Sequence, residues 1–161
     1  MLSIRAANTA DASAIWSILR PVFRAGETYA ISSDIDEADA VAYWCGPNHE
    51  TYVAEEHGEI LGTHYLRENQ AGGGSHVANC GYMTLAKAQA RGIARRMLEH
   101  SLVRAKERGF RAMQFNFVVS TNERAIRTWE AYGFRKVGCI PLGFNHPTLG
   151  FVDAFVMHKA I

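Results

Sequence analysis

Apolar residues recur along the chain with two spacings, one typical of helices and one typical of strands. Residues 12–23 show helical spacing behind a candidate N-cap at Asp11, although Pro21 should kink or end this helix. The same reasoning predicts helices at 34–44, 93–108 and 121–134, strands at 2–7, 51–56, 59–67, 76–85, 111–120, 135–140 and 151–160, and loops at 24–33 and 141–150.

The order of these elements predicts the fold class. Strands separated by helices favour parallel pairing, whereas a hairpin turn at His57 and Gly58 adds antiparallel pairs. We therefore predict an α/β (α+β) chain with a mixed sheet of about seven strands and helices on both faces. The length of 161 residues fits one domain over residues 1–161, and 48% apolar residues suffice for one core.

Composition and charge exclude several classes of protein. A formal net charge of +1 gives no electrostatic footprint for nucleic acid. No apolar run reaches the length of about 18 residues that a membrane span needs, and the first residues do not resemble a secretion signal. Cys45, Cys80 and Cys139 are too widely spaced for a disulfide framework or a zinc site, and the histidines show no metal-binding spacing. We expect a cytoplasmic protein without a metal.

Small residues stand at the start of the helix predicted at 93–108. In the preceding stretch "QARGIA", residues 89–94, Gly92 and Ala94 leave the backbone accessible. The first N–H groups of a helix lack partners and the dipole adds about half a positive charge, so a phosphate could bind here. A short loop before an exposed basic helix is the alternative, and the local sequence leaves both open. Neither a P-loop nor a Rossmann glycine pattern is present.

Residues 89–94 also resemble the Q/R-x-x-G-x-G/A motif of the GNAT superfamily of acetyl-CoA-dependent N-acetyltransferases. A second match follows in the next helix, where Asn122-x-x-Ala125, an aromatic residue at 129 and Gly133-Phe134 stand in the family's order. Since the order of elements agrees as well, the resemblance covers essentially the whole chain. It implies acetyl-CoA as co-substrate and a sheet that splays between its fourth and fifth strands, where thioester and amine meet.

The resemblance also implies the residues that bind the coenzyme. Main-chain groups of the motif would hold the diphosphate, the end of the fourth strand would bind the pantetheine arm, and Asn122 would reach that arm from the next helix. The implied coenzyme-binding residues are Met83, Thr84, Leu85, Gln89, Ala90, Arg91, Gly92, Ile93, Ala94, Arg95 and Asn122.

The sequence departs from the family pattern at two catalytic positions. Many members carry a tyrosine four residues before the Gly-Phe pair as general acid, but here Trp129 stands there, and its indole N–H is not a usable acid. Tyr132 lies about 300° around the helix from that position, so we expect it to face elsewhere. Many members also carry a glutamate on the fourth strand as base, whereas residues 76–85 contain no carboxylate. The general acid and base therefore stay unidentified.

Two asparagines, Asn79 and Asn116, are the candidate catalytic residues. Strand alternation predicts Met113, Phe115 and Phe117 on one face of the fifth strand, and Gln114, Asn116 and Val118 on the other. A buried amide without a partner costs about 1–3 kcal/mol, so both asparagines need partners. They either satisfy backbone groups where the strands separate or donate to the substrate or the thioester oxygen, and the sequence leaves both open.

The segments 79–83, 115–122 and 152–154 look similar to a GNAT branch that acetylates amino acids and toxic analogues. That branch includes phosphinothricin and methionine-sulfoximine acetyltransferases and fungal azetidine-carboxylate enzymes. A site without a strong base favours an α-amine, which titrates near about 7.7–8.0, over a lysine amine near about 10.4.

We therefore expect acetyl transfer to the amine of a small amino-acid-like molecule. Glu27, Tyr29 and Tyr82 are candidate substrate contacts, although a solvated carboxylate and two core tyrosines are the plain alternatives. The competing functions are acetylation of protein amines and non-catalytic binding of acyl-CoA. The loops at 24–33 and 141–150 could close the acceptor site. Analogy to relatives adds a possible homodimer.

Overall fold

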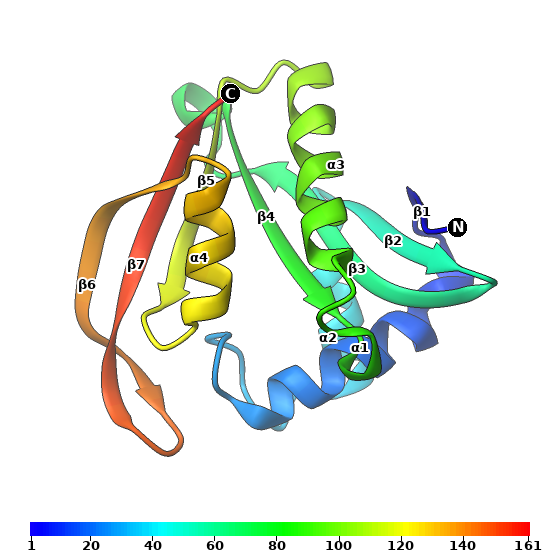
Figure 1. Ribbon diagram of the computed structural model, residues 1–161, viewed down its shortest axis with the longest axis horizontal. Helices are drawn as coiled ribbons and strands as arrows, with labels where there is room; N and C mark the ends of the chain where they lie inside the picture. Colours follow the sequence, from blue (N-terminus) through cyan, green and yellow to red (C-terminus); the bar gives the residue numbers. More distant parts are fainter.

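The computed structural model describes residues 1–161, whose strands form one seven-stranded sheet in the order β1-β2-β3-β4-β5-β7-β6 (Figure 1). The strands are β1 (Ser3–Ala6), β2 (Glu50–Glu56), β3 (Glu59–Glu68), β4 (Val77–Thr84), β5 (Ala112–Val119), β6 (Arg135–His146) and β7 (Gly150–Ala160). The helices are α1 (Ala12–Ala25), α2 (Glu37–Trp44), α3 (Ile93–Glu107) and α4 (Glu123–Ala131), with short 3-10 turns η1 (Thr9–Asp11), η2 (Gly72–Gly74) and η3 (Ala86–Ala88). The predicted fold class is confirmed.

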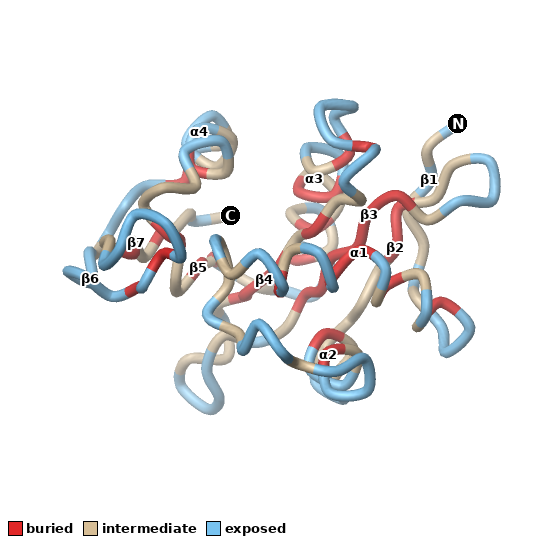
Figure 2. The backbone as a smooth tube through the Cα atoms, turned by 90° about the horizontal axis from the view of Figure 1, so that it is seen from below, coloured by how far each residue is buried: buried red, intermediate tan, exposed pale blue.

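Neighbouring side chains on β3 show how the helices divide between the two faces of the sheet. Tyr65 packs against Trp44 of α2, with ring centroids 4.9 Å apart, in the core beneath α1 and α2. Leu66 belongs to the core beneath α3 and α4. Figure 2 shows α2 on one side of the strands and α3 and α4 on the other. The two faces of the sheet thus carry separate apolar cores.

The strands β4 and β5 lie side by side only where they begin. Val77 pairs with Ala112 and Ala78 with Met113, after which no residues of the two strands pair. By contrast, β3 and β4 stay paired along the whole of β4. Figure 1 shows β4 and β5 diverging from this point. The splay that the family resemblance implies is thus present, and β4 has a free edge from Asn79 onward.

Helix α1 continues through Pro21, so of the two predicted effects of this residue, a kink or an end, the end does not occur. The helix ends at Gly26, which has a left-handed φ of 65°. Phe23, beyond the proline, is buried against the sheet. This packing of the apolar face outweighs the one backbone hydrogen bond that a proline removes. None of the helices combines the length and the apolar character that a membrane span requires.

The segment 141–150, predicted as a loop, belongs largely to β6. The strand reaches His146 and pairs with β7 through two register shifts, the second between Ile140 and Phe144. An edge strand tolerates proline and irregular residues, and Leu142 takes a positive φ of 50° within this shift. Only residues 147–149 form the connecting turn. The segment lines neither of the two cavities described below, so it does not close the acceptor site.

A bulge in β5 overturns the predicted alternation of its side chains. The register with β7 shifts between Phe115 and Val118. Val118 therefore joins Phe115 in the core beneath α3 and α4, instead of facing away with Asn116. Phe117 packs near Phe144 of β6, with ring centroids 6.2 Å apart. Bulges re-aim side chains beside functional sites, and this one lies where β5 leaves β4.

Candidate active site

The start of α3 forms an open cradle of backbone. Ala90 and Gly92 both have positive φ, 63° and 77°, and Gly92 is the N-cap of α3. A Cβ at Gly92 would meet no atom within 4 Å, so this side of the loop is open. Arg96 is the first residue whose N–H group donates a hydrogen bond within the helix, to the carbonyl of Gly92 at 3.1 Å. The N–H groups before it fit an anion such as a diphosphate.

Two arginines beside the cradle, Arg91 and Arg95, are held by acidic or phenolic partners. Arg91 pairs with Glu56 of β2. Arg95 Nε lies 3.1 Å from a carboxylate oxygen of Glu99 and 2.5 Å from the hydroxyl of Tyr132 on α4. Tyr132 thus braces α4 against α3 and lines neither cavity. This confirms the prediction that its hydroxyl faces away from the position occupied by the family tyrosine.

A cavity of about 300 Å³, the coenzyme groove, extends from the cradle to the gap between β4 and β5. Of the implied coenzyme-binding residues, those that line it are Met83, Thr84, Gln89, Ala90, Gly92, Ile93, Ala94, Arg95 and Asn122. Leu85 and Arg91 do not line it. The side chain of Leu85 packs instead against the apolar cores beneath α1 and α3.

The free edge of β4 forms one wall of the coenzyme groove. The N–H of Leu85 donates to a carbonyl of β3 at 2.8 Å. Because alternate residues of a strand direct their backbone groups to the same edge, Met83 also faces β3, and Tyr82 and Thr84 face the gap. In agreement, the carbonyl of Tyr82 accepts a hydrogen bond from the hydroxyl of Tyr29 at 3.3 Å. Tyr82 and Thr84, rather than Met83 and Leu85, therefore offer main-chain groups to the groove.

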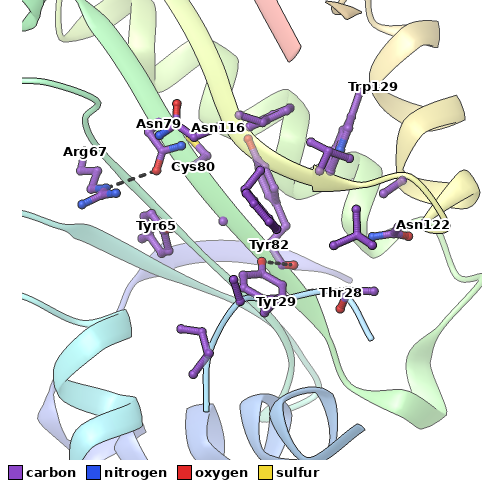
Figure 3. Close-up of a pocket in the computed structure, with 18 of the residues that line it drawn as sticks. Thr28, Tyr29, Tyr65, Arg67, Asn79, Cys80, Tyr82, Asn116, Asn122 and Trp129 are labelled. Atoms are coloured by element: carbon purple, nitrogen blue, oxygen red, sulfur yellow. Dashed lines mark hydrogen bonds between the residues drawn. The ribbon is translucent and has the colours of Figure 1, made fainter. Parts of the chain in front are cut away.

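A second cavity of about 250 Å³, the acceptor cavity, contains both candidate asparagines (Figure 3). Asn79 is 6% exposed, its Nδ2 donates to the carbonyl of Gln114 at 2.9 Å, and its Oδ1 accepts from Arg67 Nε at 3.2 Å. Asn116 Nδ2 donates to Asn69 Oδ1 at 2.6 Å, and its Oδ1 accepts from Gln114 Nε2 at 3.0 Å. Both amides have partners, and Asn79 satisfies a backbone carbonyl where the strands separate. Each Nδ2 keeps a second hydrogen.

The two cavities share a wall at the gap. The residues that line both are Thr28, Tyr29, Tyr82, Asn122, Ala125 and Trp129. Asn122 is the N-cap of α4, but its side chain makes no capping hydrogen bond, so its amide is available to a ligand. The ring of Trp129 packs 5.2 Å from that of Tyr82 and 4.9 Å from that of Phe115. An apolar aromatic wall therefore stands where many family members carry the tyrosine.

The titratable phenols and the thiol at the gap stay protonated at neutral pH. Burial raises the pKa of Tyr29 and of Tyr82 well above the usual range, and it raises the pKa of the Cys80 thiol to about 12. The hydroxyl of Tyr82 shares a hydrogen bond of 2.6 Å with Ser101 of α3, so it points away from the acceptor side. Glu27 is exposed and lines neither cavity. None of these four groups is placed to act as a general base.

Three polar residues of the acceptor region, Arg67, Asn69 and Gln114, were not predicted from the sequence. The pairing of β3 with β4 sets Arg67 opposite Asn79, and counting back across the loop at 69–76 would have found this neighbour. The contact between Asn69 and Asn116 depends on the splay and on the bulge in β5, and no local pattern predicts it.

Comparison with known proteins identifies the family. The sequence profile of the acetyltransferase (GNAT) family matches residues 12–134. The chain belongs to the GNAT family. This confirms the family that the two motifs predicted. The histidine, cysteine, aspartate and glutamate side chains of this GNAT protein form no group of three or more that could hold a metal ion.

Individual GNAT relatives agree with the fold but differ in what they are named for. The chain is 34% identical over 98 residues to the N-acetyltransferase aca1 of Schizosaccharomyces pombe; the match covers 60% of this chain and only 47% of aca1, about half its length. A GCN5-related N-acetyltransferase from Kribbella flavida is 39% identical and superposes with a TM-score of 0.94, covering 99% of this chain and 98% of that one.

A phosphinothricin acetyltransferase from Sinorhizobium meliloti, solved with acetyl-CoA, is 20% identical with a TM-score of 0.86, covering 99% and 88% of the two chains. At that identity the likeness shows the fold alone. Solved ribosomal-protein-alanine N-acetyltransferases share this fold too, so the resemblance to the phosphinothricin branch is not specific.

Proposed function

We propose that this GNAT protein is an enzyme that transfers the acetyl group of acetyl-CoA to the amine of a small amino-acid-like molecule. The observation that carries the proposal is the shared wall at Trp129 and Asn122, where the coenzyme groove meets a small second cavity. The volume of this acceptor cavity, about 250 Å³, suits a molecule of amino-acid size. It lies just below the range of about 300–1,000 Å³ that ligand sites usually occupy.

The coenzyme groove fits acetyl-CoA at three places. The backbone at Ala90 and Gly92 is open and offers N–H groups for the diphosphate. The free edge of β4 offers the main-chain groups of Tyr82 and Thr84 to the pantetheine arm, as a neighbouring strand would. The amide of Asn122 has no capping bond to compete with the ligand.

Acetyl-CoA supplies an activated acyl group, and the residues of the acceptor cavity position the amine beside it. No carboxylate or histidine lines this cavity, so the amine enters neutral or gives its proton to water. A neutral amine attacks directly, and its positioning in the gap supplies most of the acceleration. The second hydrogens of Asn79 Nδ2 and Asn116 Nδ2 are donors for the carbonyl oxygen that gains negative charge. The nitrogen–carbon bond forms and the carbon–sulfur bond breaks. The proton that the attacking nitrogen loses passes to the departing thiolate or to water, and coenzyme A leaves through the groove.

The first test is thiol release from acetyl-CoA with purified protein and a panel of amines. Free L-amino acids and methionine sulfoximine are compared with polyamines, with lysine peptides and with peptides that carry free N-termini. We expect release with the amino acids alone. Release with peptides alone would replace the proposal by protein acetylation. Tight coenzyme A binding without any release would support a non-catalytic acyl-CoA-binding protein.

The pH profile of kcat/KM is expected to show the pKa of the acceptor's amine and no pKa of an enzyme group. Because burial raises the pKa of Tyr29, of Tyr82 and of Cys80, these groups stay protonated and contribute no ascending limb near neutral pH. The value of kcat/KM should rise with pH through the pKa of the acceptor's own amine and then level off. Measured with two acceptors of different amine pKa, the midpoint should move by the same difference. A midpoint that stays fixed would reveal a base on the protein.

A further inference from the structure

Arg67 is the one charged side chain among the 19 residues that line the acceptor cavity. It lies near the end of β3, directly opposite Asn79 on β4. The remaining lining residues are neutral, and most of them are apolar. A molecule that enters this cavity therefore meets one positive charge and no negative charge.

The structure holds the Arg67 guanidinium in place by one nitrogen only. Its Nε donates to Asn79 Oδ1 at 3.2 Å, and Asn79 is itself anchored to the carbonyl of Gln114 at 2.9 Å. The guanidinium carbon lies over the ring of Tyr65, 6.0 Å from the ring centroid, as in a cation–π contact. The two terminal nitrogens of Arg67 make no hydrogen bond within the chain, and Arg67 takes part in no ion pair.

This arrangement differs from that of two arginines beside the helix start that binds the diphosphate in our proposal. Arg91 and Arg95 each pair with a glutamate. A guanidinium with both terminal nitrogens free presents the fork that binds a carboxylate through two parallel hydrogen bonds. In Figure 3, Arg67 and Trp129 lie on opposite sides of the asparagine pair, so the charge lies away from the wall shared with the coenzyme groove.

We propose that Arg67 binds the carboxylate of the acceptor, so that the substrate is an amino acid with a free carboxylate. The proposal rests on the proposed acetyl transfer and narrows its substrate. With the carboxylate on Arg67, the amine of the same molecule points along Asn79 and Asn116 toward the gap. A residue at a protein N-terminus has no carboxylate beside its amine, because that group forms the next peptide bond. Arg67 therefore selects free amino acids over peptides and polyamines.

The test compares acids with their primary amides. Alanine, valine, leucine, methionine and phenylalanine are assayed with their amides, and kcat/KM is expressed per neutral amine because the amide lowers the pKa of the amine. We expect the wild-type protein to prefer the best acid over its amide by about 30-fold or more, as for a charge pair that loses one partner. The variant Arg67→Met should lose this preference because kcat/KM falls for the acid and stays unchanged for the amide. The variant Arg67→Lys should keep part of the preference.

The matched control is Arg111→Met, which removes an exposed arginine that lines neither cavity and should change neither rate. Equal rates for acid and amide in the wild-type protein would overturn the proposal. So would an Arg67→Met variant that loses acid and amide activity equally, because that result indicates a structural role.

A binding measurement separates this proposal from the proposed function. The N-acetylated forms of the same five amino acids and of their amides are titrated by calorimetry into protein saturated with coenzyme A. Binding of the acids that is lost in Arg67→Met supports the carboxylate site even if no amine is turned over. Absence of carboxylate-dependent binding overturns the site even if acetyl transfer to some other amine is observed.

Discussion

The Asn79→Ala variant is expected to bind acetyl-CoA normally and to lose about 100- to 1,000-fold in kcat, the cost typical of removing one donor to a developing oxyanion. Asn79 lines the acceptor cavity, and one hydrogen of its Nδ2 bonds to the carbonyl of Gln114 at 2.9 Å. In the proposed reaction the second hydrogen donates to the oxyanion. Rates at saturating acceptor separate this effect from that of Arg67, which should appear mainly in KM.

The same substitution has a structural consequence that has to be measured beside it. Asn79→Ala leaves the partly buried Gln114 carbonyl without this donor, which costs up to about 1–3 kcal/mol of stability. Thermal unfolding and calorimetric titration of coenzyme A therefore accompany the kinetics, with the exposed Asn145→Ala as control. A variant that unfolds at a lower temperature yet keeps its kcat would assign Asn79 to the architecture of the gap and exclude it as a donor.

The Gly92→Asp variant is expected to weaken binding of coenzyme A by about 100-fold or more. The substitution places a carboxylate at the helix start, where the N–H groups and the dipole favour the diphosphate, and the two negative charges repel. The backbone at Gly92, with φ of 77°, also disfavours any side chain. Calorimetric titration of coenzyme A measures the dissociation constant directly and needs no acceptor.

Gly109→Asp is the matched control for this effect. Gly109 follows the other end of α3, has a similar φ of 80°, and also has open space where a Cβ would stand. The two variants share the conformational strain and the added charge but differ in their distance from the cradle. If both weaken binding equally, the cause is strain or helix stability, and the diphosphate lies elsewhere.

Much of the fold could be predicted because its signals are local. Apolar spacing, together with residues typical of helix starts and ends, predicted all four α-helices, and the turn at His57 and Gly58 predicted the hairpin. The errors arose where packing between distant segments overrides local preference. Pro21 lies inside a helix because Phe23 beyond it is buried, and Leu142 lies inside a strand because β7 pairs with the residues around it.

In the candidate site, too, the features set by local sequence could be predicted and those set by distant segments could not. The cradle at Gly92 was predictable, since a helix start and its capping residue are adjacent in sequence. The partners of Asn79 and Asn116 were not, because they come from residues 67, 69 and 114, brought together by strand register and by the bulge in β5. The local sequence around Arg67 indicates only an ordinary arginine at the end of a strand. Its free guanidinium is a property of the assembled cavity alone.

The short contact between β4 and β5 would make the lifetime of this protein depend on the supply of acetyl-CoA, if the coenzyme binds as we propose. Two residue pairs join the halves of the sheet, so a bound pantetheine arm would add main-chain hydrogen bonds along the free edge of β4. Ligand binding then adds about 2.7 kcal/mol to the unfolding free energy at a free concentration 100 times Kd. Cells that run short of coenzyme would hold the chain in its more easily opened form, exposed to proteases. The abundance of the protein would thereby follow the supply of the compound that it consumes.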